Sequence, residues 1–126
     1  MNEGYKGGFE ELDVWKEARK YRKIISELVS TFPSEEKYKL VNQLTRAVRS
    51  ITANIAEGYG RFHYQENIQY CRQARGSLME TLDHLICAND ENYIDDAVLA
   101  KFRDHYSLIL KLLNGYIAYL KRRKEE

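Results

Sequence analysis

The sequence contains few of the residues that interrupt helices or cross-link chains. Its 126 residues include one proline and two cysteines. Cys71 and Cys87 are sixteen positions apart, which matches none of the close Cys-x-x-Cys pairs of metal or redox sites. No secretory signal peptide is recognisable. We therefore expect two buried thiols in a reducing cytoplasm.

Long apolar runs and an excess of one charge are also absent. No run approaches the roughly 20 apolar residues of a membrane span, so we expect a soluble, cytoplasmic protein. Lys and Arg number 20 and Asp and Glu 19, for a net charge of +1. This balance favours neither a nucleic-acid nor a membrane partner, and only the distribution of charge is informative. Residues 78–96 carry six carboxylates and no Lys or Arg, whereas residues 121–124 are all basic.

Apolar residues recur at steps of three and four, the spacing of one buried helix face. The pattern predicts helices from about Leu12 to Phe32, from Ser34 to the Gly58–Gly60 turn, from about Gln65 to Asn89, and from about Asp95 to Lys121. Pro33 ends the first helix, and Ser34 is the expected N-cap of the second. Short connections force neighbouring helices antiparallel. We predict an all-α, up-down-up-down antiparallel four-helix bundle over residues 9–122, with a flexible tail at 1–8 and a charged tail at 123–126.

Three glycines have structural meaning in this scheme. Gly58 and Gly60 supply the backbone freedom that ends the second helix and turns the chain. Gly76 lies in the middle of the third helix, where a glycine costs about 1 kcal/mol relative to alanine. A close approach of another helix at Gly76 would offset that cost.

The fourth helix is more apolar than one packing seam requires. One stripe satisfies an intramolecular bundle, and a second stripe predicts packing against another subunit. The predicted oligomer interface comprises Leu99, Tyr106, Leu110, Leu113, Ile117 and Leu120. An unusually wide core face within one chain is the alternative.

No constellation of residues predicts catalysis. Glu80 and His84 share a helical face at i, i+4 and would supply two metal ligands, but no second pair accompanies them. Neither cysteine has a histidine that the sequence places as an activating base. We predict no catalytic residues, no metal and no cofactor. A metal-dependent enzyme using Glu80, His84 and His105 is a third hypothesis.

Basic and aromatic residues are the better indication of function. Guanidinium groups beside exposed aromatic faces are suited to gripping phosphates and stacking unpaired bases. The predicted nucleic-acid-binding residues are Arg46, Arg49, Arg61, Arg72 and Arg75, with Tyr59 and Tyr64 as stacking platforms. Alternatively, the arginines pair with Glu57, Glu66 or Glu80 and the tyrosines cap the bundle.

Three segments carry a resemblance to a known family. They are Leu12–Ala18 (LDVWKEA), Phe32 through Asn54–Gly58 (NIAEG) to Arg61, and Ala74–Leu78 (ARGSL) with Glu80. Over about residues 9 to 90 the chain resembles the bacterial four-helix bundle proteins encoded in intervening sequences of large-subunit ribosomal RNA, which are labelled ribosomal proteins. The resemblance implies a ring-like homo-oligomer, a pentamer, and no catalytic residues. Related bundles are accessory proteins of retroelement reverse transcriptases and bind nucleic acid through a basic surface.

Two functions follow. The first is a non-catalytic, self-associating bundle that binds RNA electrostatically, because an oligomer multiplies a modest arginine patch. The second is a protein-protein adaptor or an accessory subunit of a nucleic-acid enzyme. The acidic stretch from Glu80 to Asp96 favours the second, since it can pair with the basic face of a neighbour.

Overall fold

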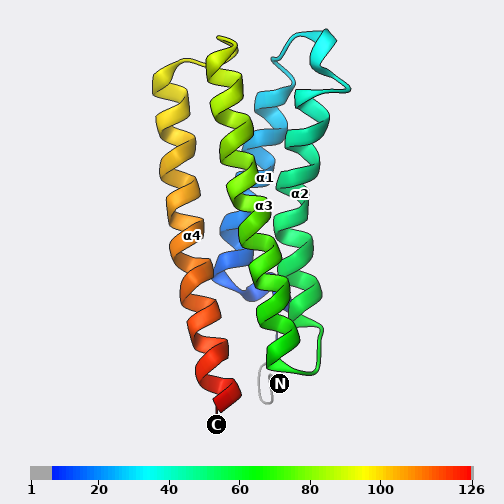
Figure 1. Ribbon diagram of the computed structural model, residues 1–126, viewed down its shortest axis with the longest axis vertical. Coiled ribbons are helices and arrows are strands. Elements are labelled where there is room, and N and C mark those ends of the chain that lie inside the picture. The colour runs from blue at the N-terminus through cyan, green and yellow to red at the C-terminus, as the bar shows by residue number, and fades with distance from the viewer. Residues whose placement is uncertain (1–6, 126) are drawn as a thin grey trace.

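The chain forms four long helices, which the computed structural model describes over residues 7–125. The helices are α1 (Asp13–Val29), α2 (Leu40–Tyr59), α3 (Tyr64–Asp90) and α4 (Asp96–Glu125), with short 3-10 turns η1 (Phe9–Glu11) and η2 (Ser34–Glu36). Consecutive helices run antiparallel (Figure 1). The predicted all-α four-helix bundle is confirmed.

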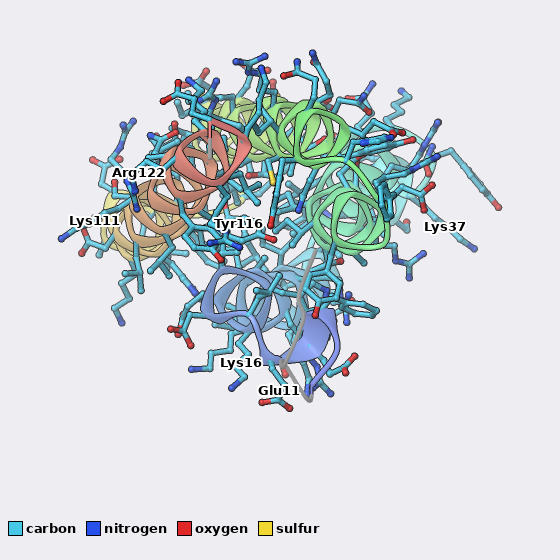
Figure 2. All side chains as sticks on the ribbon, turned by 90° about the horizontal axis from the view of Figure 1, so that it is seen from below. Glu11, Lys16, Lys37, Lys111, Tyr116 and Arg122 are labelled. Carbon is cyan, nitrogen blue, oxygen red and sulfur yellow. The ribbon has the colours of Figure 1, made fainter. Side chains whose placement is uncertain are left out.

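The connections lie at the two ends of the bundle. The α1–α2 and α3–α4 connections lie at one end, and the α2–α3 turn lies at the other end beside the C-terminal part of α4 (Figure 1). Seen along the bundle axis, α1 lies opposite α3, with α2 and α4 on either side (Figure 2). α1 therefore has two neighbours, α2 and α4, and a flank directed to each.

The apolar stripe of α1 fills the core as its spacing predicts. Val14, Ala18, Tyr21 and Ile25 are all buried, at steps of four, three and four residues. The Tyr21 hydroxyl hydrogen-bonds the Thr81 hydroxyl of α3 at 2.9 Å, which satisfies the buried phenol. Burial raises the pKa of Tyr21 to about 12. One polar pair thus ties α1 to the helix opposite it.

The close approach between helices occurs at Gly58, and the prediction that it occurs at Gly76 is wrong. A Cβ at Gly58 would lie 2.7 Å from Oδ1 of Asn67 and 2.9 Å from Cβ of Tyr70, so α3 packs directly on this backbone. A Cβ at Gly76 would meet nothing within 4 Å. Gly76 is two residues beyond buried Ala74, about 200° around the helix, and therefore faces outward.

Three helix boundaries differ from the predicted ones. The second helix begins at Leu40 and not at Ser34, because no side chain from 33 to 39 is buried and the apolar stripe starts at Leu40. The first helix ends at Val29, three residues before Phe32. α4 continues to Glu125, so the predicted charged tail is helical as far as the structure describes it. Of the predicted N-terminal tail, residues 1–6 lie outside the described residues.

Candidate nucleic-acid interface

Arg46 lies on the flank of α2 that faces α3. The Ser50 and Ser77 hydroxyls hydrogen-bond across these two helices at 2.9 Å. A groove of about 400 Å³ runs along this line, and its walls include Arg46, Ser50, Ser77 and Glu80. Arg46 is exposed and forms no ion pair among residues 7–125. It therefore offers a cation in a polar groove that a carboxylate shares.

Arg61 is occupied at the α2–α3 turn. Its guanidinium donates to Oε1 of Glu57 at 2.7 Å and to the Tyr70 hydroxyl at 2.7 Å, and it lies 3.8 Å from Oε2 of Glu66. The same group lies 5.0 Å from the centre of the Tyr70 ring. Tyr70 and Glu57 together raise the pKa of Arg61. This site matches the alternative in which an arginine pairs with Glu57 and Glu66.

Arg72 and Arg75 lie on the side of α3 that faces α4, away from the α2–α3 groove. Arg75 donates to Oδ1 of Asn114 on α4 at 2.8 Å, which places Arg75 at the α3–α4 boundary. Arg72, three residues earlier, is exposed and shares this side of the helix. No described carboxylate lies within ion-pair distance of either guanidinium.

Arg49 lies at a third place, on the flank of α2 that faces α1. Arg22 of α1 donates to the Thr52 hydroxyl at 2.8 Å, so Thr52 marks this flank. Arg49 is one turn before Thr52 and is exposed, without an ion pair to any residue that the structure describes. The five predicted arginines therefore do not form one patch. Arg46 and Arg49 are neighbours on the outer face of α2, leaning toward α3 and α1 respectively, whereas Arg61 lies at the α2–α3 turn and Arg72 and Arg75 lie at the α3–α4 boundary.

The two predicted stacking residues are engaged within the chain. The Tyr59 hydroxyl donates to the Gly7 carbonyl at 3.2 Å and is half-buried. The ring of Tyr64 packs under the guanidinium of Arg123 at 5.9 Å. These contacts favour the alternative in which the tyrosines cap the end of the bundle.

Two other aromatic side chains are open to solvent. Tyr38 is 81% exposed and Phe62 is 80% exposed, in the connections before and after α2. Tyr38 stands between Lys37, whose ammonium lies 5.3 Å from the ring centre, and Lys39. Sequence reasoning missed Tyr38 because it assigned residues 34–39 to a helix. The sequence does contain an indication of this exposure, because Lys37, Tyr38 and Lys39 directly precede Leu40, the first buried residue of α2.

A comparison with protein families decides the identity of the chain. The description "23S rRNA-intervening sequence protein" belongs to the family whose sequence profile matches residues 10–115. The match extends from η1 to a point two thirds of the way along α4. The chain belongs to this family. No curated protein matches the chain.

The predicted oligomer seam of this 23S rRNA-intervening sequence protein lies mostly inside the single chain. Tyr106, Leu113, Ile117 and Leu120 are buried in the core, and Leu99 and Leu110 are half-buried against it. α4 contacts α3 on one flank and α1 on the other, which explains the width of its apolar face. The alternative of a wide core face therefore accounts for the burial of these positions within one chain.

Apolar side chains do remain exposed where α4 meets α1. Leu108 of α4 is 44% exposed and Ile24 of α1 is 43% exposed. A shallow hollow of about 800 Å³ lies over α1, with Trp15 and Leu108 among its lining residues and a mixed rim of acidic and basic side chains. This side therefore carries exposed apolar surface of the kind that contact with a second subunit would bury.

Two histidines of this family member each contact one carboxylate, and of the two cysteines expected to be buried only Cys71 is buried. His84 contacts Glu80 at 3.0 Å, and His105 contacts Glu17 of α1 at 3.2 Å. Within residues 7–125 no three His, Cys, Asp or Glu side chains lie close enough to hold a metal ion. Burial raises the pKa of Cys71 to about 12, so its thiol is a poor nucleophile. None of the described helices is long and apolar enough to span a membrane.

Proposed function

We propose that this protein is a non-catalytic, self-associating bundle that binds RNA. The family description connects such proteins with intervening sequences in 23S rRNA, which supports an RNA context. The exposed arginines support the same conclusion, because several of them stand on helix faces without a carboxylate within ion-pair distance among the described residues. RNA phosphates are the partner that such arginines suit.

One observation carries the proposal. Arg46, Arg49 and Arg72 are exposed, and none has a carboxylate within ion-pair distance among the described residues. Guanidinium groups without internal counter-ions lose no ion pair when they contact a phosphate. Only Arg61 among the five predicted arginines is held by carboxylates of the chain.

The experiment is fluorescence-anisotropy binding to structured and single-stranded RNA across a salt series. We expect log K to fall linearly with log salt, with a slope of about 0.7 per phosphate contact on single strands. Replacing Arg46 and Arg49 together by alanine is expected to weaken binding without unfolding the bundle, because both side chains are exposed. Unchanged binding by the double variant contradicts the assignment, and no binding at low salt contradicts RNA binding itself.

Self-association is the second element of the proposal, and the side where α1 meets α4 is its surface. The exposed Leu108 and Ile24 support this choice, since apolar side chains at the edge of a hollow lose surface to water when a second copy packs there. Leu108→Glu is expected to dissociate the oligomer, as measured by light scattering. Ser107→Glu, a change at the preceding exposed position of the same helix, is expected to leave the oligomer intact. An equal effect of both variants contradicts this surface.

The adaptor hypothesis stays as the alternative. The same apolar side supports it, because another protein could occupy it in place of a second copy. A wild-type protein that is monomeric and binds no RNA favours the adaptor. A protein that elutes with nucleic acid and releases it in salt favours the RNA binder.

A further inference from the structure

The charged residues of α1 differ in sign between the flank that faces α4 and the flank that faces α2. Glu17 contacts His105 of α4, so its flank faces α4. Asp13 lies on this same flank, one turn before Glu17, whereas Glu27 lies on the outer face of the helix, one turn after Lys23. None of the three carboxylates of α1 therefore lies on the flank that faces α2.

The charged residues on the opposite flank of α1 are cations, and Lys23 lies at the outer edge of that flank. Arg22 contacts Thr52, so its flank faces α2. Arg19 lies one turn before Arg22 and Lys23 one turn after Arg19, and both are exposed. The guanidinium of Arg19 lies 5.8 Å from the centre of the Trp15 ring. No carboxylate that the structure describes forms an ion pair with these three cations.

Arg22 is the unusual member of this group. It is half-buried between the two helices, and its contact within the described chain is one hydrogen bond to the Thr52 hydroxyl. Arginines in partly buried places are normally paired with a carboxylate, because removing the charge from water is costly. The other guanidinium nitrogens of Arg22 are accessible, since no buried side-chain nitrogen in residues 7–125 lacks a partner. They can therefore donate to an anion outside the chain.

α2 adds a fourth cation next to Arg22. The Thr52 hydroxyl that accepts from Arg22 itself donates to the Arg49 carbonyl at 3.2 Å, so the Arg22 guanidinium lies against the turn of α2 that begins at Arg49. The one carboxylate of α2, on Glu57, is bound to Arg61 on the α3 side. Four cations from two antiparallel helices thus share one surface. The carboxylates of α1 lie beside it: Glu27 is next to Lys23, and Asp13 and Glu17 line the hollow that Arg19 and Lys23 also line.

We propose that this α1–α2 cationic surface (Arg19, Arg22, Lys23 and Arg49) is where the protein contacts the RNA backbone. The inference rests on the proposed RNA-binding function and names the face that performs it. Three of the four cations are arginines, whose planar forks match phosphate oxygens. The exposed apolar residues that would anchor a protein partner, Ile24 and Leu108, belong to the α1–α4 side instead. A polyanion is therefore the occupant that fits this surface.

Arg49 of α2 and Arg103 of α4 form a matched pair for the first test. Both are exposed arginines without an ion pair in the described chain, and only Arg49 belongs to the cationic surface. At about 0.1 M salt, losing one phosphate contact weakens single-strand binding about five-fold and lowers the salt slope by about 0.7. We expect this loss from Arg49→Ala and a change of less than about two-fold from Arg103→Ala. An equal or larger loss from Arg103→Ala overturns the proposal.

A second matched pair adds charge without removing any contact. Ser26 is exposed one turn after Arg22, and Ser107 is exposed on α4. Ser26→Glu and Ser107→Glu change the net charge equally, but only Ser26→Glu places a carboxylate in the cationic surface. We expect Ser26→Glu to weaken RNA binding several-fold and Ser107→Glu to leave it nearly unchanged, because charges beyond about 10 Å are screened. Equal effects overturn the assignment of the face.

The outcomes separate the face from the function. Wild-type protein that binds no RNA at low salt contradicts the proposed function, and the surface assignment falls with it. If the wild-type protein binds RNA and neither Arg49→Ala nor Ser26→Glu changes its affinity, the assignment of the α1–α2 cationic surface is wrong while the proposed function stands. Polyglutamate that competes as well as RNA of equal charge overturns RNA as the occupant and favours an acidic protein. The single tryptophan, Trp15 beside Arg19, supplies an independent reporter, and its fluorescence is expected to change on binding.

Discussion

Replacing Gly76 by alanine is expected to stabilise the protein. Gly76 is exposed in the middle of α3, and an added Cβ would meet nothing within 4 Å. The substitution therefore adds helix propensity at no steric cost. Alanine is favoured over glycine by about 0.8–1 kcal/mol in a helix interior. Unfolding entropy of about 2.1 cal/mol/K per residue makes 1 kcal/mol about 4 °C for a chain of this length.

The matched control is the same substitution at Gly58. There the new Cβ would lie 2.7 Å from Oδ1 of Asn67, which is buried and donates through its amide to the Tyr116 hydroxyl at 3.1 Å. Asn67 cannot move away without losing that bond. Overpacking costs about 1–3 kcal/mol, which exceeds the propensity gain. We expect Gly58→Ala to lower Tm.

Thermal unfolding followed by circular dichroism measures both variants. The reasoning predicts shifts of opposite sign, with Gly76→Ala above the wild type and Gly58→Ala below it. A fall in Tm for Gly76→Ala would mean that something packs on this glycine, and the structure of the isolated chain would then not describe its surroundings. A concentration-dependent fall would identify that neighbour as a second copy.

Denaturant unfolding of four further variants tests the core, the burial of the α4 stripe and the pH dependence of stability. Tyr21→Phe, which removes the hydroxyl that bonds to the Thr81 hydroxyl, is expected to cost about 1 kcal/mol. Leu113→Ala should lower the free energy of unfolding by about 2–5 kcal/mol because Leu113 is fully buried, and Leu108→Ala should lower it far less. Similar losses for the two variants would contradict the burial of Leu113 in the core. Lys20 lowers the pKa of Glu17, so the carboxylate stabilises the fold above its unfolded pKa, and the deficit of Glu17→Gln should disappear as pH falls below 4.5.

Local pattern was sufficient for the helices of this protein. The steps of Val14, Ala18, Tyr21 and Ile25 predicted the buried face of α1, because apolar side chains on one helix face must be removed from water. The start of α2 was mispredicted for a related reason. Ser34 resembles an N-cap, but capping is worth only about 1 kcal/mol and does not extend a helix through residues that bury nothing.

Neighbouring helices decided what the pattern left open. The sequence could not distinguish Gly58 from Gly76, since both are glycines within helical segments and only one meets another helix. The width of the α4 stripe fitted either a second subunit or a second intramolecular neighbour. In the structure Leu113 and Leu120 are buried within the single chain.

The arginines show the same division. Arg46 and Arg49 are three residues apart and both exposed, and the sequence placed them in one patch with Arg61, Arg72 and Arg75. The packing of α2 between α1 and α3 places Arg46 in the wall of the α2–α3 groove and Arg49 one turn before Thr52, which contacts α1.

The sequence by itself determined four amphipathic helices, their antiparallel order and the family, because these depend on residue spacing and on motifs within single segments. Tertiary structure alone decided which glycine is packed, which stripe is core and which cations share a surface. Each of these depends on the rotation of one helix against its neighbours. That rotation is set by contacts between residues far apart in the chain, such as Arg22 with Thr52 and Tyr21 with Thr81.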